Sequence, residues 1–376
     1  MSAIPFAFLE RWWLLPDAFS AFVFLVGWAA GWIGFVRAKR LPQVKEPGSQ
    51  VEVAVSIHES PVRAAVSVIV PCRNEATNLV NLLPTLRSAL RADDEIIVVD
   101  DDSDDDTVAV AHNLGANVVS VGSLPPSWVG KSNACWHGAQ SAQHDVLLFV
   151  DADVRVGAGA VDDIVTLLNE HPEAVVSAMP WHRTKRWVER LSMLFNVNSA
   201  MVASVGHRGA RRVAYGPFLA VRREAYLQSG GHAHPLVRGA VVEDLALARV
   251  MPSAVATVAS KSQVEYRMYP LGARQLLEGW TKNTAIGAAN VPRWSAALII
   301  VWIVSLCGGP LTSVWCYVLS SAQISVIARR FGNFGVFSAL AYPLHVAVFV
   351  VVAVRSALRS VLFGHVAWRG RTIATR

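Results

Sequence analysis

The sequence predicts an α/β fold, a mostly parallel sheet of Rossmann-like type, with membrane helices at the N-terminal and C-terminal ends. Between about residues 65 and 260, short β-rich runs alternate with helical stretches. Strands that alternate with helices indicate a parallel sheet covered on both faces. Apolar residues make up 53% of the chain and charged residues 16%, a balance that indicates membrane segments.

The expected sheet elements follow one another in order. The expected strands are Val66–Val70, Glu95–Val99, Asn117–Val121, Asp145–Val150 and Ala174–Ala178. The expected helices are Asn78–Leu90, Thr107–Leu114, Ser132–Ala142 and Ala158–Asn169. Ligands of such sheets bind at the carboxyl ends of the strands. We therefore look for the chemistry at those ends.

An uncharged run of 19 residues, Ala18–Val36, is long enough to cross a bilayer as a helix. No basic segment precedes it and no clear cleavage site follows, so we interpret it as an uncleaved anchor. Arg37, Lys39 and Arg40 follow directly, and the positive-inside rule then predicts a cytoplasmic region.

The C-terminal part contains two further apolar runs. Ser295–Ala328 contains 34 uncharged residues. At about 1.5 Å per residue, this run is too long for one straight transmembrane helix and short for two. Gly308-Gly309-Pro310 could break it. Phe331–Val354 supplies another span, with Pro343 as an expected kink. The basic tail favours the cytoplasm, which requires an even number of crossings after the central region; their number stays open.

These features divide the chain into four parts. They are an anchor (1–36), a linker (37–64), a cytoplasmic domain with interfacial helices (65–290), and a C-terminal membrane region with a basic tail (291–376). The expected location is the inner (cytoplasmic) membrane of the cell, crossed more than once. The net charge of +6 lies largely beside apolar runs, which suits anionic lipids and does not indicate nucleic acid. The four cysteines show no zinc spacing.

Polar clusters follow the first two strands. After the first come Pro71, Arg73 and Glu75, which could hold a base or ribose or simply form a strand-to-helix turn. After the second come Asp100 and Asp101, where a buried carboxylate needs a partner. Uracil and ribose offer matching donors, although a solvated acidic loop is the simpler interpretation.

The next two motifs suit a diphosphate and a metal ion. Lys131 follows a glycine at a helix start and could meet phosphate, although the sequence is not a P-loop. An apolar strand then delivers Asp151 and Asp153. Magnesium and manganese take oxygen ligands, often one or two carboxylates together with substrate phosphates. The metal would neutralise charge on a departing nucleoside diphosphate.

Two later motifs suit the acceptor side. Glu243 and Asp244 begin a helix, where they are either capping groups or a general base. Trp280 and Lys282 belong to a stretch that reads as an interfacial helix, with the indole at the headgroup level. A plain membrane-contacting helix is the alternative to acceptor binding.

PCRNE, VVDDDS, DAD and VED, in this order, resemble the family 2 glycosyltransferases of GT-A fold. PPSWVGKSNACWHGA, PWHRTKRW, YGPFLAVRREAYLQSGGH and YRMYPLGARQLLEGWTKN are similar to the carotenoid-modifying subgroup of 4,4'-diaponeurosporenoate type. The resemblance covers roughly residues 65 to 376. It implies inverting transfer of a hexose from UDP-glucose, with Mg²⁺ or Mn²⁺, to a lipophilic, carotenoid-like acceptor.

The resemblance also implies residue roles. The uridine would be held by Pro71, Arg73, Glu75 and Asp101. Lys131 would reach the diphosphate, Asp151 and Asp153 would contact the donor and the metal, and Asp244 would be the base beside Glu243.

Two departures qualify the resemblance. The usual glycine of DDGS is Asp102, which tolerates left-handed backbone. The QxxRW motif of processive synthases is absent, which favours a single transfer. The alternatives are a family 2 enzyme that acts on a hopanoid or polyprenyl phosphate, a nucleotidyltransferase, and a non-catalytic membrane scaffold. A nucleotidyltransferase would need a Gly-rich loop after the first strand, and this chain has PCRNE there.

Overall fold

The computed structural model describes residues 17–44, 63–205, 212–288, 291, 293–363, 365–368 and 371–374. The chain forms two compact units, and each is made of separate segments. We call residues 40–181 and 212–266 the sheet unit. Residues 1–39, 182–211 and 267–376 are the helical unit. The division expected from the sequence was contiguous, whereas these units interleave along the chain.

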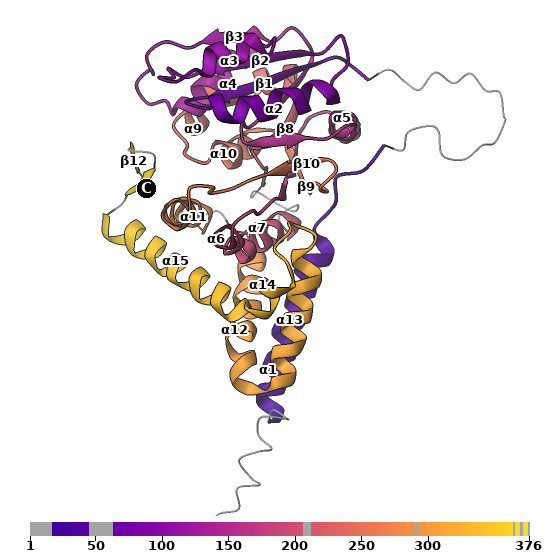
Figure 1. The fold of residues 1–376 in the computed structure, drawn as a ribbon, viewed down its shortest axis with the longest axis vertical. Helices are drawn as coiled ribbons and strands as arrows, with labels where there is room; N and C mark the ends of the chain where they lie inside the picture. Colours follow the sequence, from indigo (N-terminus) through magenta and orange to yellow (C-terminus); the bar gives the residue numbers. More distant parts are fainter. Residues whose placement is uncertain are drawn as a thin grey trace, which may run out of the picture. The chain divides into compact units, whose positions relative to one another are not determined.

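The sheet unit is built on a seven-stranded sheet of order β3-β2-β1-β4-β8-β6-β9 (Figure 1). Its strands are β1 (Val66–Cys72), β2 (Glu95–Asp100), β3 (Asn117–Ser120), β4 (Val146–Val150), β6 (Ala174–Met179), β8 (Phe218–Arg222) and β9 (Ser253–Val258). Among the described pairs of this sheet, β8 runs antiparallel to its two neighbours and the other pairs are parallel. The expected mostly parallel sheet is confirmed, and each of the five expected strands matches an observed one within two residues.

Helices and short elements complete the sheet unit. They are α2 (Ala76–Ala89), α3 (Thr107–Asn113), α4 (Gly130–Ser141), β5 (Val154–Val156), α5 (Ala160–Glu170), α8 (Arg223–Gln228), η2 (Gly231–Ala233), α9 (Pro235–Arg238), α10 (Glu243–Val250) and β10 (Val264–Tyr266). Strand β7 (Trp181–His182) lies where the chain leaves the unit. One hydrophobic cluster joins alternate residues of the sheet, such as Ile69, Leu147 and Leu219, to α4 and α10. Since strand side chains alternate between faces, these two helices cover one face of the sheet.

The order of the central strands positions the candidate site. Strands β2, β1 and β4 are parallel neighbours, so their carboxyl ends meet at one edge. Their apolar runs are fully buried, and each run ends where the polar residues begin. Pro71, Asp100 and Asp151 therefore lie at the same edge of the sheet.

The helical unit contains three helices long and apolar enough to cross a membrane. They are α1 (Ala18–Arg37), α12 (Arg293–Thr312) and the part of α15 (Tyr342–Phe363) that ends at Arg359. The unit also contains α6 (Trp187–Arg190), α7 (Met193–Val205), α11 (Ala273–Ala288), α13 (Val314–Ala328), α14 (Val336–Leu340), β11 (His365–Trp368) and β12 (Arg371–Ala374). α13 is apolar but has only 15 residues.

Two local expectations for the membrane region were wrong. The long uncharged run breaks at Ser313, three residues beyond the expected Gly308-Gly309-Pro310. Ser313 is extended and its hydroxyl accepts from the Trp315 amide at 3.2 Å, so it caps α13. Pro343 is the second residue of α15 and produces no kink. Proline fits the first turn of a helix, because an N–H there has no helical partner.

The packing of α1 depends on small residues and one amide. Gly27 and Gly31 lie so close to α12 that a Cβ on either would collide with Ser305 or Trp302. The Gln323 side chain accepts from the Trp302 indole at 2.9 Å and donates to the backbone oxygen of Trp28 at 2.6 Å. Small residues let helices approach closely within a bilayer, and polar side chains bond across them.

Candidate active site

A small cavity at the carboxyl ends of the central strands brings five of the predicted residues together. Its lining is Pro71, Lys131, Cys135, Phe149, Asp151, Gly216, Leu219, His232, Glu243 and Asp244. The residues come from β1, α4, β4, β8, η2 and α10 and from the loops beside them. The cavity volume is about 10 Å³, close to the space that one water molecule needs. Lys131, Asp151, Glu243 and Asp244 thus converge although they are up to 113 positions apart in the sequence.

Lys131 links two of the predicted motifs. Its Nζ atom lies 2.7 Å from an oxygen of Asp151 and 2.7 Å from an oxygen of Glu243. Burial opposes the charged form of this lysine, but the two carboxylates outweigh that effect and raise its pKa well above the usual value. Lys131 is therefore a permanent cation among carboxylates.

Asp244 is a carboxylate with an unusual environment. One oxygen accepts from the Gly216 amide at 2.7 Å, and the other accepts from the Leu245 amide at 2.8 Å. Burial, and then the negative charge of Glu243, raise its pKa to about 6, although Lys131 and the Gly216 amide act in the opposite direction. A carboxylate with a pKa near 6 is suited to proton transfer near neutral pH.

The loops after β1 and β2 are tied together. The Asn74 amide donates to the Ser103 hydroxyl at 2.9 Å, and the Asp104 amide donates to the Asn74 side chain at 2.8 Å. Arg73 forms an ion pair with Asp101 at 3.7 Å. Asp102 has a φ of 59°, so the aspartate at the usual glycine position adopts the left-handed backbone, as predicted.

The remaining predicted donor-binding residues lie in the same two loops. Asp100 is buried, and its Oδ1 atom has no hydrogen-bond partner among the described residues. The Asp101 carboxylate packs against Gly130, where a Cβ would collide with it. The Glu75 side chain accepts from the Asn78 side chain at 2.6 Å. A buried carboxylate oxygen without a donor is costly, so Asp100 is a position where a ligand donor would be favourable.

Asp151 and Asp153 flank the turn between β4 and β5. Both side chains are partly buried, and the Val154 amide donates to the Asp151 carbonyl at 3.2 Å. Among the described residues, no group of three or more His, Cys, Asp or Glu side chains could hold a metal by itself. Two carboxylates nevertheless fit a Mg²⁺ or Mn²⁺ ion that completes its coordination with substrate phosphates and water.

Trp280 does not have the environment expected of an interfacial indole. It is 6% exposed, stacks on Phe195 at 4.6 Å between ring centroids, and donates to the Ser192 hydroxyl at 2.9 Å. The hydroxyl and the ring hold the indole inside the helical unit, which disfavours the direct contact with lipid headgroups that an interfacial tryptophan makes. Lys282, two positions further along α11, is partly exposed.

Sequence reasoning missed His232 and Gly216, which also line the cavity. Both belong to the segment YGPFLAVRREAYLQSGGH. Gly230 and Gly231 have φ values of 80° and 48°, which strongly favour glycine. The two adjacent glycines before His232 were the sequence feature that could have indicated a tight turn holding this histidine.

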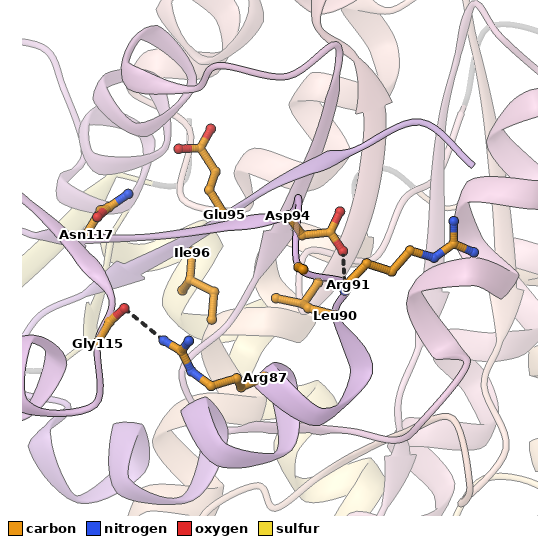
Figure 2. A pocket seen from close by; sticks show the side chains of 9 residues that line it. Arg87, Leu90, Arg91, Asp94, Glu95, Ile96, Gly115 and Asn117 are labelled. Carbon is orange, nitrogen blue, oxygen red and sulfur yellow. Dashed lines mark hydrogen bonds between the residues drawn. The ribbon is translucent and has the colours of Figure 1, made fainter. Parts of the chain in front are cut away.

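A larger pocket of about 350 Å³ lies elsewhere on the sheet unit (Figure 2). Glu95 and Asn117 line it, and both are the first residues of their strands, so it lies at the opposite edge from the candidate site. Its charged groups have internal partners: Arg87 donates to the Gly115 carbonyl at 2.8 Å, and Asp94 pairs with Arg63 at 2.6 Å. Size alone therefore does not identify the site.

The sequence profile of Glycosyl transferase family 2 matches residues 67–227. These residues run from β1 to α8 and include the strands that carry Pro71, Asp100 and Asp151. The chain carries a family 2 glycosyltransferase domain. The predicted family is confirmed, while Glu243, Asp244 and the helices from α11 onward lie outside the matched segment.

Known proteins are similar to this chain over most of its length. The 4,4'-diaponeurosporenoate glycosyltransferase of Staphylococcus aureus strain USA300 is 29% identical over 333 residues, which cover 82% of this chain and 88% of the relative. The enzyme of strain MRSA252 is 29% identical over 335 residues with the same coverage. The mannosyltransferase PcManGT of Pyrobaculum calidifontis has a TM-score of 0.53 and 16% identity, over 93% of this chain and 99% of that one. This likeness supports the GT-A fold.

Proposed function

We propose that the protein transfers a hexose from a UDP-sugar to a lipophilic, carotenoid-like acceptor at a membrane, with inversion and with help from a divalent metal. The observation that carries this proposal is the convergence of Lys131, Asp151, Glu243 and Asp244 around one cavity at the carboxyl edge of the sheet. That edge is where α/β sheets bind their ligands.

The donor would lie along this edge. Asp100 and Asp101 offer acceptors to the uracil and ribose, and Pro71, Arg73 and Glu75 would complete the nucleoside site. Lys131 would exchange its carboxylate partners for diphosphate oxygens. Asp151 and Asp153 would hold Mg²⁺ or Mn²⁺, which when bound neutralises negative charge on the departing nucleoside diphosphate.

The acceptor side of the reaction is assigned to Asp244. Its raised pKa and its fixed amide contacts suit a base that removes a proton from an acceptor hydroxyl. Glu243 would orient Lys131 and keep the pKa of Asp244 high. A carboxylic acid acceptor, such as the substrate named for the Staphylococcus aureus relatives, would arrive already ionised and need little from the base.

A membrane site of action is supported by the composition of the helical unit. Its sequence has 20 Lys and Arg residues against four Asp and Glu, a formal charge of +16, whereas the sheet unit has 14 against 24, a charge of −10. Basic residues beside membrane helices favour an anionic leaflet. We therefore place the sheet unit on the cytoplasmic side, with α1 as an anchor that ends at Arg37 and is followed by Lys39.

The deciding experiment uses the full chain purified in detergent, with Mn²⁺, UDP-glucose and an apocarotenoid carboxylic acid, and detects the glucosyl ester by mass. Product that requires both Mn²⁺ and Asp153 supports the donor class, the reaction and the acceptor together. GDP-mannose is included because PcManGT was solved with GDP-Man and Mn²⁺. Slow release of UDP from UDP-glucose without the glucosyl ester would still support a glycosyltransferase. Hopanoid and polyprenyl acceptors would then be tested. Absence of any nucleotide binding would overturn the proposal.

A further inference from the structure

His232 is a buried imidazole that the reaction described above does not use. It is 3% exposed and lies in η2, directly after Gly230 and Gly231. Its ring centroid is 5.2 Å from that of Phe149 and 5.7 Å from that of Tyr226. A Cβ on Gly231 would collide with the Tyr226 ring, so glycine is needed to bring the two rings together. The local sequence therefore builds a fixed position for this imidazole.

The hydrogen bonds of Tyr226 determine which ring nitrogen of His232 carries the proton. The Tyr226 hydroxyl accepts from the His232 backbone amide at 3.1 Å and lies 2.8 Å from His232 Nδ1. Because a buried hydroxyl proton needs an acceptor, the phenol donates to Nδ1. A neutral imidazole has one N–H, which is then at Nε2. Burial, and then the charge of Lys131, lower the pKa of His232 to about 3, so the ring stays neutral.

The Nε2–H group is available to a ligand. Among the described residues Nε2 has no hydrogen-bond partner, although His232 lines the cavity with Lys131, Glu243 and Asp244. Once a bound substrate excludes water from the cavity, an N–H donor without an acceptor costs free energy, so a substrate oxygen atom beside it would be favourable. The cavity has room for about one such atom.

The charges around the cavity indicate what kind of oxygen it takes. Three carboxylates line it, from Asp151, Glu243 and Asp244, against one ammonium group from Lys131. With Asp151 assigned to the metal ion and Lys131 to the diphosphate, the carboxylates of Glu243 and Asp244 remain beside the imidazole, and their negative charge disfavours an anionic oxygen next to His232. A neutral hydroxyl suits both the imidazole and the carboxylates, because it can accept from the imidazole N–H and donate to a carboxylate.

We propose that His232 is a specificity-determining residue whose imidazole N–H binds one hydroxyl group of the donor sugar. The inference rests on the proposed function, since it requires a nucleotide-sugar donor whose sugar reaches this cavity. Tyr226 acts as a positioning residue, because it fixes the tautomer that presents the N–H. The site thus recognises a polar substituent of the sugar, and a donor that lacks this hydroxyl leaves the imidazole donor unpaired.

The test is calorimetric binding to the full chain in detergent with Mn²⁺, using UDP, UDP-glucose and the four UDP-glucose analogues that lack the 2-, 3-, 4- or 6-hydroxyl. We expect one analogue to bind wild-type protein about 5- to 100-fold more weakly than UDP-glucose because it strands a buried donor. His232→Phe keeps a ring packed against Phe149 and Tyr226 but has no N–H. It should bind UDP like the wild type and lose the discrimination against that analogue.

Three further variants keep the test decisive. His232→Gln retains an N–H donor and should keep part of the discrimination. Tyr226→Phe frees the tautomer and should weaken the discrimination without removing the imidazole, which covers the case in which His232→Phe does not fold. His182→Phe replaces an equally buried histidine of the helical unit, bonded to Asn196 at 2.9 Å, and should leave the discrimination unchanged.

The outcomes distinguish a failure of the proposed function from a failure of the role of His232. If the wild-type protein binds neither UDP nor UDP-glucose, the proposed function fails and the inference fails with it. If UDP and UDP-glucose bind, but His232→Phe and Tyr226→Phe discriminate among the analogues as the wild type does, the cavity holds only water and the role of His232 is overturned.

Discussion

The pH dependence of transfer should reveal whether Asp244 acts as a base. Its pKa is raised to about 6 by burial and by Glu243, and a base works only when it is deprotonated. With an alcohol acceptor, the rate should therefore fall about tenfold per pH unit below about 6, reaching roughly one tenth of its plateau at pH 5. With a carboxylic acid acceptor, already ionised above about pH 4, the rate should be nearly flat from pH 5 to 8.

Substitution of Asp244 should affect the rate with the alcohol acceptor far more than the rate with the acid acceptor. Asp244→Asn should lower turnover of the alcohol by about 10²–10⁴-fold and remove the acidic limb of its profile, because the base is gone. The same variant should change turnover of the acid little. Glu243→Gln removes the negative charge that raises the pKa of Asp244, so it should shift the limb of the alcohol profile to lower pH.

The assay measures initial rates by product mass on a matched pair of apocarotenoid acid and alcohol, at saturating UDP-glucose, from pH 5 to 8. UDP binding to each variant, measured at each pH, controls for folding and for donor affinity. Equal losses for Asp244→Asn on both acceptors would refute the assignment of a base. A wild-type alcohol profile without a limb near pH 6 would do the same.

Three further outcomes follow from the structure. Asp153→Ala should abolish turnover while the protein stays folded in the membrane fraction, and wild-type turnover in that variant would remove the metal assignment. Gly130→Ala should weaken UDP binding in titrations, because the new Cβ displaces the Asp101 carboxylate at a cost of about 1–3 kcal/mol; unchanged affinity would count against Asp101 as a uridine ligand. Gln323→Leu should destabilise the helical unit by about 1–3 kcal/mol, because the Trp302 indole loses its acceptor, and thermal unfolding in detergent measures this.

Much of the sheet and of its functional edge could be predicted from sequence, since the signals are local. Apolar runs at β1, β2 and β4 each end in polar residues, and adjacent parallel strands bring such ends together. The position of Lys131 after a glycine at a helix start predicted a phosphate contact, and the structure places it 2.7 Å from Asp151. The left-handed backbone at Asp102 followed from the conformational tolerance of aspartate.

The features that sequence reasoning missed depend on contacts between distant segments. Strand β8 lies antiparallel between β4 and β6. Nothing in the five residues of β8 indicates which strands it pairs with. The amphipathic pattern around Trp280 does not say whether the indole meets lipid or protein, and Ser192 and Phe195 decide it. His232 joins the cavity only because Tyr226 and two glycines fix its position.

The interleaving of the two units imposes an order on synthesis. The ribosome makes α1 first, and the segment 182–211 emerges between β6 and β8, before α11, α12, α13 and α15 exist. Among the described helices that α7 chiefly contacts (α1, α12, α13 and α15), α1 alone has been made at that stage, and Met201 packs beside Gly34. All residues of the sheet unit have been synthesised at residue 266, whereas the helical unit still lacks its C-terminal helices. Such distant contacts slow folding. A nascent chain stalled after residue 266 should therefore already bind UDP, although its membrane helices are incomplete.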